Sequence, residues 1–355
     1  MKSYAGEREM TSLSIIYSLI PILAVLAGTE ANLMAGGAVV NAALCFLITL
    51  LMLKPVKKYF VIWGNISIAD AMKDTFGSSV AYIVCMSFFI LFSLSCICSL
   101  NICTILISDL TIKSLPSQSI RLVISLSAVF LAYLGTEALT RHSYVILFVG
   151  YILMGTLIYA SFRGWNTDNL YPLLGVSVKE TFTNYIGVCI FSSVAPMLFM
   201  CNSLKSREGV YKCIKKTVII SNVIMILTLL IYALTVPYPV GTLYSHSLEA
   251  IFSSGSSGDV FHRFEIFLIS LFTLFALVSV SYSIIVCTKI LKNLFGFTDT
   301  RPLVLIVGIL FGSLSGFDWS ARQYIFSGIF LAVLSFFVPL ILYIRKKSDK
   351  KAVDL

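Results

Sequence analysis

Long uncharged, apolar runs separated by short polar segments dominate this chain. The first run covers the 20 residues between Glu9 and Glu30, and similar runs recur as far as Ile344. A helix needs about 20 apolar residues to cross a bilayer. The spacing of the runs therefore predicts ten membrane-spanning helices. They lie within the windows 10–29, 31–53, 75–108, 122–136, 142–162, 185–204, 217–248, 264–288, 302–317 and 323–344. A cytosolic loop with Lys54, Lys57 and Lys58 is expected after the second window, with a short amphipathic helix from Ser67 to Phe76, and Arg163 to Glu180 is expected to form an ordered external loop.

The sixth run, Tyr185 to Leu204, carries a proline at its centre, in the sequence Ser192-Ser193-Val194-Ala195-Pro196. Proline has no backbone N–H, and its ring pushes against the carbonyl four residues before it. Backbone groups left unpaired at this depth cost several kcal/mol each, unless protein or a water-filled cavity receives them. Transporters hold small solutes at such broken helices. We therefore expect a break in helix 6 and a solute site beside it.

Pro21 lies near the middle of the first run and predicts a break in helix 1, although an ordinary packing kink is the alternative. Breaks in helices 1 and 6 indicate two five-helix repeats of inverted topology, the LeuT-like 5+5 arrangement. The whole chain, 1–355, then forms one membrane domain. Its parts are the first repeat (1–163), the core of the second repeat (181–315), helix 10 (322–344) and a basic cytoplasmic tail (345–355).

Composition supports the same class of protein. Hydrophobic residues make up 58% of the chain and charged residues 12%, whereas soluble domains have about 25% charged residues. The mean hydropathy is +0.94. If both termini face the cytosol, 20 of the 26 Lys and Arg residues lie on the cytosolic side, as the positive-inside rule requires. The net charge of +9 thus reflects membrane topology, and we expect no nucleic-acid partner.

The sequence contains no pattern for catalysis or metal binding. Its nine cysteines show no paired CxxC spacing and it has three histidines, whereas zinc sites and disulfide frameworks need clustered ligands. No Ser-His-Asp set, P-loop or pair of carboxylates lies within a span. We therefore predict a protein that is not an enzyme and binds no cofactor. Proton coupling usually involves an ionisable side chain within the membrane, and none lies mid-span.

Polar residues within the apolar runs mark candidate site positions. Ser279, Tyr282 and Ser283 share one helical face in span 8, and such a stripe is expected to face the bundle and not lipid. Ser192 and Ser193 offer hydroxyls at the expected break, although serine can also hydrogen-bond back to its own helix.

Three stretches of the chain, HRFEIFLISLF with KILKNLFGF (262–297), ISIADAMKDTFG (66–77) and YPLLG (171–175), resemble the endospore germination permease family. Its members are the B subunits of spore germinant receptors, within the amino acid–polyamine–organocation superfamily. The resemblance covers about residues 10 to 347. It implies a LeuT-like fold, a small-molecule site between spans 1, 3, 6 and 8, and a germinant-sensing role in the inner membrane of the spore.

On this resemblance the ligand-binding residues are Ile20, Pro21, Ile22, Ser95, Ser192, Ser193, Ala195, Ser279, Tyr282 and Ser283. The family usually has a glycine-containing break in span 1, and a small residue followed by an acidic one in span 6. Here Ile20-Pro21-Ile22 provides no glycine N–H, and Ser193 to Ala195 is followed by no carboxylate.

The resulting expectation is a receptor subunit that binds a small germinant, an amino acid by resemblance, and signals within the bilayer to an A-type membrane subunit and a C-type lipoprotein. Two alternatives remain. One is an amino acid permease working by alternating access, and the other is a structural membrane subunit with a degenerate pocket.

Overall fold

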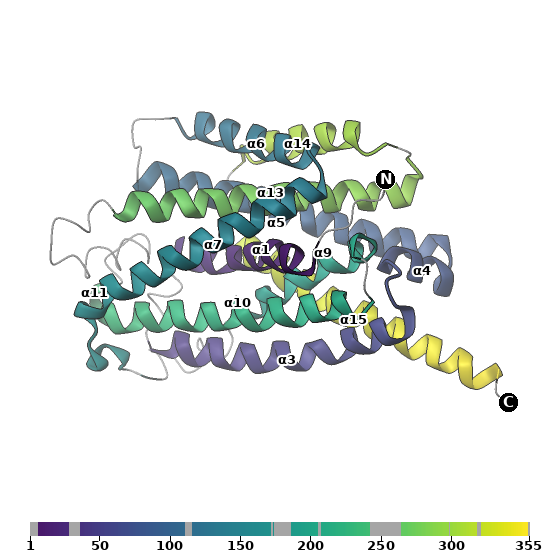
Figure 1. The fold of residues 1–355 in the computed structure, drawn as a ribbon, viewed down its shortest axis with the longest axis horizontal. Coiled ribbons are helices and arrows are strands. Elements are labelled where there is room, and N and C mark those ends of the chain that lie inside the picture. The colour runs from purple at the N-terminus through teal and green to yellow at the C-terminus, as the bar shows by residue number, and fades with distance from the viewer. Residues whose placement is uncertain are drawn as a thin grey trace.

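The protein is an all-helical bundle whose helices follow a common long axis (Figure 1). The computed structural model describes residues 6–27, 36–110, 116–171, 173, 186–204, 207–241, 264–297, 299–317 and 321–353. Within these ranges every regular element is a helix and no strand occurs.

Six helices in the described part of the chain are long and apolar enough to cross a membrane. They are α3 (Gly37–Trp63), α5 (Ser78–Leu110), α7 (Thr136–Ser161), α10 (Arg207–Thr235), α13 (Phe264–Phe295) and α15 (Ala321–Val353). Shorter apolar helical segments accompany them. These are α1 (Glu7–Ala27), α6 (Ser117–Tyr133), the pair η3 (Ile186–Ser193) and α9 (Val194–Phe199), and α14 (Arg301–Leu314). The chain is therefore an integral membrane protein.

Helix α1 lies in the interior of the bundle, where it packs against α7, α10, α13 and η3. Helices α5 and α13 pack along each other on one side of it, and α3 and α10 pack together on the other. The pair α6 and α14 lies along one edge (Figure 1). That pair is close because position 308 of α14 is glycine, where an added Cβ would overlap the Val129 side chain of α6.

The structure corrects the predicted end of span 2. Helix α3 continues through Pro55 to Trp63. It therefore contains Lys54, Lys57 and Lys58, which were expected in a loop. A proline removes one helical hydrogen bond, and the bonds on either side of it can hold the helix together. The C-terminal segment is likewise helical, since α15 continues to Val353.

The expected break at Pro21 is not found, because α1 is one continuous helix from Glu7 to Ala27 with this proline inside it. Pro21 still deprives the Tyr17 carbonyl of its usual donor. The cost is one helical hydrogen bond, and α1 stays helical on both sides of Pro21.

The short amphipathic helix expected from Ser67 to Phe76 is confirmed as α4 (Ile68–Phe76). The Ser67 hydroxyl caps it by accepting the Asp70 N–H at 3.3 Å. The Lys73 amine donates to the Asn293 carbonyl at 2.7 Å, which ties α4 to the last turn of α13. The expected ordered loop after span 5 is described as far as residue 171, with 173. In it, the Asn169 amide donates to the Leu234 carbonyl of α10 at 3.0 Å.

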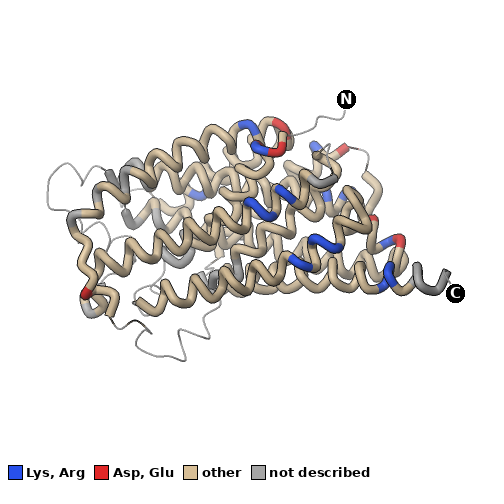
Figure 2. Tube along the Cα trace, turned by 60° about the horizontal axis from the view of Figure 1, so that its bottom comes forward, with Lys and Arg blue, Asp and Glu red and all other residues tan. Residues whose placement is uncertain are grey.

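Lys and Arg residues gather at one end of the bundle, which we call the lysine-rich end (Figure 2). Helices α3, α13 and α15 end there and α1, α10 and α14 begin there. Its described basic residues include Lys54, Lys57, Lys58, Lys212, Lys215, Lys216, Lys289, Lys292, Arg345, Lys346 and Lys347.

Candidate ligand site

Two tyrosines from distant parts of the chain meet in the interior. The rings of Tyr17 on α1 and Tyr282 on α13 pack edge to face, with centroids 5.6 Å apart and planes at 85°. The Tyr17 hydroxyl lies near the hydroxyls of Ser95 on α5 and Ser283 on α13. The Tyr282 hydroxyl lies near that of Ser14 on α1. We call these five residues the hydroxyl cluster.

Three hydroxyls of this cluster have no hydrogen-bond partner. The side-chain oxygens of Ser14, Tyr17 and Tyr282 are fully buried, and none of them reaches a protein donor or acceptor with hydrogen-bond geometry. The hydroxyls of Ser95 and Ser283 lie near that of Tyr17, and the hydroxyls of Ser14 and Tyr282 lie near each other, but these contacts do not meet hydrogen-bond geometry. Buried polar groups are normally paired with protein or water. Three unpaired oxygens around two touching rings therefore mark this region as one that accommodates a polar molecule.

Helix α1 provides its share of the cluster through ordinary helical spacing. Ser14, Tyr17 and Ser18 stand three and four residues apart, so they lie on neighbouring parts of one face. Tyr17 turns toward α5 and α13, whereas the Ser18 hydroxyl pairs with that of Ser221 on α10. Sequence reasoning missed the side chains of Ser14 and Tyr17. In span 8, polar residues that share one helical face were expected to point into the bundle. The same argument applied to span 1 would have identified Ser14 and Tyr17.

Helix α13 separates its polar residues by the same periodicity. Tyr282 and Ser283 face α1. The Ser281 hydroxyl lies on a different side and donates to the Ala128 carbonyl of α6 at 3.0 Å. Ser279 is buried one turn before, and its carbonyl accepts the Ser283 hydroxyl at 3.1 Å.

The proline-containing run after η2 (Thr167–Leu170) is not a regular α-helix. It consists of the 3₁₀ segment η3 followed by α9, and the type of helix changes at Ser193–Val194. A 3₁₀ run of eight residues is long, since most have three or four, and such a stretch often marks a hinge or strain. Pro196 falls in the first turn of α9, where its missing N–H would have had no helical partner.

The structure brings together only part of the predicted site. Ser95, Tyr282 and Ser283 converge on Tyr17. In span 6 the Ser193 hydroxyl donates back to the Ile190 carbonyl at 2.9 Å. Segment η3 packs on α1, but within the described ranges no polar contact joins it to the cluster. Ser279 touches the cluster through its carbonyl, which accepts the Ser283 hydroxyl. The remaining predicted residues are buried without such a contact: Ile20, Pro21, Ile22, Ser192 and Ala195.

Charge is excluded from the interior around the cluster. Among the described residues, those that are buried include no Asp, Glu, Lys, Arg or His. Two cations of the described part reach inward: Lys289, a half-buried residue of α13 whose amine donates to the Ser203 hydroxyl at 3.1 Å, and Arg121, whose guanidinium donates to the Asn101 side chain at 3.2 Å. Sequence reasoning had placed this lysine beyond the end of span 8.

The lysine-rich end is held by hydrogen bonds between elements. Besides the Lys289–Ser203 bond, the Asn65 amide donates to the Leu204 carbonyl at 3.4 Å.

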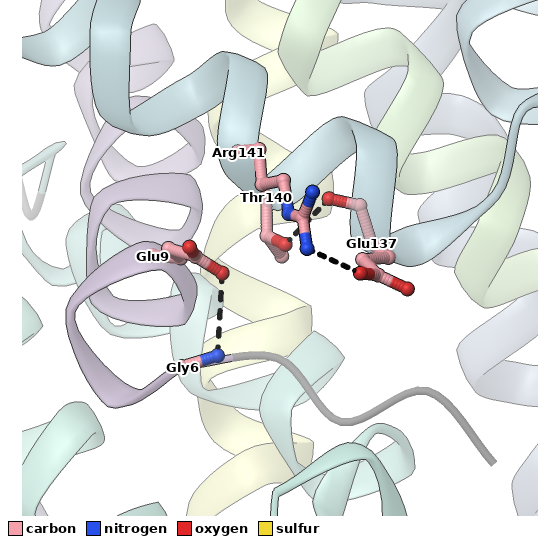
Figure 3. Close-up of polar contacts among 5 residues, drawn as sticks. All are labelled: Gly6, Glu9, Glu137, Thr140 and Arg141. Carbon is pink, nitrogen blue, oxygen red and sulfur yellow. Dashed lines mark hydrogen bonds and ion pairs between the residues drawn. The ribbon is translucent and has the colours of Figure 1, made fainter.

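Nearby on the surface, Figure 3 shows the start of α7 beside the start of α1. There Arg141 and Glu137 form an ion pair at 2.6 Å, and Glu9 accepts the Gly6 N–H at 3.3 Å.

Comparison with known proteins places the chain in a sequence family. Residues 23–316 match the profile of the family described as "Spore germination protein". No curated protein sequence matches the chain.

Solved structures with the LeuT fold of transporters share the architecture. MHP1, a nucleobase-cation-symport-1 family transporter, superposes with a TM-score of 0.61 at 13% identity, over 94% of this chain and 75% of MHP1. MhsT in complex with L-phenylalanine superposes with a TM-score of 0.60 at 13% identity, over 97% of this chain and 100% of MhsT. The manganese transporter of Eremococcus coleocola superposes with a TM-score of 0.55 at 14% identity, over 93% of this chain and 78% of that transporter. Identities this low establish the fold alone.

Proposed function

Because the chain belongs to the spore germination protein family, we propose that it is a germinant-receptor subunit. It has a transporter fold and binds a small germinant between α1, α5, α13 and the η3–α9 segment. One observation carries this proposal: three buried, unpaired hydroxyls meet where α1, α5 and α13 converge. Among the fold's transporters, broken helices and binding sites lie near the middle of the membrane.

The proposed architecture has ten spans in two inverted repeats, residues 1–163 and 181–315, followed by helix 10 (322–344). The packing of η3 against α1 supports this arrangement, because helices 1 and 6 are partners in such repeats. In this proposal η3 and α9 form the broken helix 6, and α1 forms helix 1 with no break up to Ala27. The gathering of basic residues at one end (Figure 2) supports cytoplasmic termini, and family membership supports the inner membrane of the spore.

Signalling in this proposal is a shift between two packings of the bundle. A ligand shifts such an equilibrium only if it binds one state better than the other. The receiving partners are the A-type membrane subunit and the C-type lipoprotein of the receptor. The resemblance makes an amino acid the first germinant to test.

A permease that works by alternating access is the second candidate, and the shared transporter fold favours it. Uptake separates the two candidates. The isolated chain in lipid vesicles would accumulate solute if it is a permease, and it would bind without net uptake if it is a receptor subunit.

The primary test is dipicolinate release from spores that lack this chain, challenged with a panel of amino acids, sugars and nucleosides. We expect a selective loss of the response to one compound. Wild-type spores and a complemented strain serve as controls. An unchanged response to every compound would contradict a sensing role.

A further inference from the structure

Four lysines on two packed helices form a basic surface at the lysine-rich end. They are Lys57 and Lys58 near the end of α3, and Lys346 and Lys347 on α15, and we call them the α3–α15 lysines. We propose that this surface binds the headgroup of an anionic phospholipid. The inference concerns the membrane around the bundle and does not depend on the identity of the germinant.

Two contacts between α3 and α15 hold the lysines in place. The Lys58 amine lies 5.0 Å from the ring centroid of Tyr343 on α15, and the Lys346 amine lies 4.4 Å from that of Trp63 on α3. A ring attracts a cation through its face, whereas a lysine amine has three hydrogen-bond donors. Lys58 is exposed and Lys346 is half-buried, so donors that do not face a ring can reach an anion.

The α3–α15 lysines bring like charges together, and like charges repel. Helix α4 also packs on α15 and brings two acids, Asp70 and Asp74, to this end. The Asp70 carboxylate accepts the Ser67 hydroxyl at 2.6 Å. Within the described ranges neither acid forms an ion pair with any of the four lysines. A bound anion would therefore relieve this repulsion.

Trp63 adds a hydrogen-bond donor to the same surface. Its side chain is 6% exposed, and its Nε1–H has no acceptor in the described part of the chain. A buried tryptophan N–H usually finds a partner, and tryptophan is enriched at the level of lipid headgroups. The Lys346 amine lies over this ring. A phosphate bonded to that amine can accept the indole N–H when the lysine side chain moves off the ring.

The surface beside the lysines is apolar and exposed, which favours a lipid over free phosphate. On α3, exposed Leu47 and Leu51 precede exposed Lys54 and Lys58 at spacings of one helical turn, so the four side chains share one face. On α15, three exposed apolar side chains precede the lysines: Phe337, Ile341 and Ile344. Acyl chains can cover the apolar part while the phosphate meets the amines.

The lysines also lie at the depth of a headgroup. Helix α3 begins at Gly37, and Lys58 lies about 32 Å further along it at 1.5 Å per residue. The hydrocarbon core of a bilayer is about 30 Å thick. An upright α3 that begins at one face of the core therefore places Lys58 at the other face. Basic residues at this level attract anionic lipids.

The experiment measures lipid retention by the full chain, purified in detergent and studied by native mass spectrometry. Phosphatidylglycerol is the anionic probe, and phosphatidylcholine with the same acyl chains is the probe without net charge. We expect phosphatidylglycerol to be retained with at least about tenfold higher affinity, because only this lipid brings net negative charge to the lysines. Glycerol phosphate is added as a competitor, and we expect it to leave the bound lipid in place.

Paired substitutions localise the site. Lys58→Gln together with Lys346→Gln should weaken phosphatidylglycerol retention about 30-fold, which corresponds to about 1 kcal/mol for each lysine. Lys215→Gln together with Lys216→Gln is the matched control, since it removes the same charge from exposed positions of α10 at the same end. We expect this control to retain the lipid as the wild type does.

Two further variants separate charge and hydrogen bonding from a loss of folding. Lys58→Arg together with Lys346→Arg keeps both charges and should retain phosphatidylglycerol. Trp63→Phe keeps a ring beneath Lys346 and removes the indole donor, so we expect retention about tenfold weaker. The melting temperature of each variant, measured without added lipid, shows that the protein is folded.

Three results would overturn the inference. The first is equal retention of the two lipids, and the second is displacement of phosphatidylglycerol by glycerol phosphate. The third is an equal loss in the two glutamine pairs, which would mean that the charge of this end attracts lipid diffusely. None of these readouts involves germination, so a failure here leaves the proposed receptor role standing, and a failure of the spore assay leaves this site standing.

Discussion

The hydroxyl cluster and the lysine-rich end differ in how many of their polar side chains bond across elements, although Trp63 Nε1 and Asn65 Oδ1 at the lysine-rich end are also buried without a partner. At the lysine-rich end, side chains bond across elements, as Lys73 does with Asn293 and Lys289 with Ser203. In the cluster, the hydroxyls of Ser14, Tyr17 and Tyr282 approach other polar groups without bonding to them. Low local stability is typical of binding regions, which must rearrange. In the function proposed above, the lysine-rich end holds the bundle together and the cluster rearranges around a ligand.

The largest expected effect comes from filling the cluster. Ser283→Leu places a bulky side chain against the Tyr17 hydroxyl and should lower the sensitivity of spores to the germinant by about 5- to 150-fold, which corresponds to an overpacking cost of about 1–3 kcal/mol. Dose–response curves of dipicolinate release measure it, with membrane levels of the protein checked by immunoblot. Ser335→Leu on α15 is the matched control, a buried serine that bonds within its own helix. An equal loss in both variants would indicate general misfolding, and the comparison would fail.

A second prediction tests the scaffold behind the cluster. Gly308→Ala forces a Cβ against Val129 and should lower the free energy of unfolding by about 1–3 kcal/mol through overpacking. Thermal unfolding in detergent measures this change. Gly155→Ala on α7 has open space around its new Cβ and should be neutral or slightly stabilising. Ligand preference should be unchanged in both variants. An altered preference would show that the cluster is not independent of the α6–α14 pair.

The third prediction concerns the lysine-rich end. Lys289→Met removes the bond to Ser203 and should loosen the adjoining segment η4 (Cys201–Ser203). We expect alkylation of the buried Cys201 thiol to accelerate, because exposure of the sulfur to the reagent outweighs the loss of the lysine charge, which had favoured the reactive thiolate. Site-resolved mass spectrometry of labelled protein measures the rate. Lys347→Met, at an exposed position of α15, should leave it unchanged. Unchanged labelling in Lys289→Met would mean that this lysine does not hold the end closed.

The smallest effect is expected at the surface. Glu137→Gln removes the ion pair with Arg141 (Figure 3), whose side chains are 40% and 68% exposed. Exposed pairs four residues apart on a helix contribute about 0.3–0.5 kcal/mol. Unfolding at low and high salt measures the change, which should vanish at high salt. If the free energy of unfolding fell by more than about 1 kcal/mol, this ion pair would belong to the contacts that hold the bundle together. The comparison between the hydroxyl cluster and the lysine-rich end would then omit a stabilising region.

Local signals in the sequence predicted most of what lies along the chain. The apolar runs predicted membrane helices, and the amphipathic pattern from Ser67 to Phe76 predicted α4. Hydrophobicity and capping involve neighbours only a few residues apart, so they can be read without the fold. The same rules misjudged helix ends: α3 continues through Pro55 and α1 through Pro21. A single proline removes one hydrogen bond, and packing on neighbouring helices decides whether the helix continues.

By itself, the sequence determined that this protein lies in a membrane, where its polar residues fall along each span, and its membership of a germination family. Only the tertiary structure decided which of those polar residues meet. Ser18 and Ser221 pair across 203 positions, and Tyr17 meets Tyr282 from the far half of the chain. The periodicity of a helix fixes which residues share a face, but the partner of that face depends on how the helices pack. For this reason serine positions in spans 3 and 8 could be named from sequence, whereas the unpaired hydroxyls of Ser14 and Tyr17 required the assembled bundle.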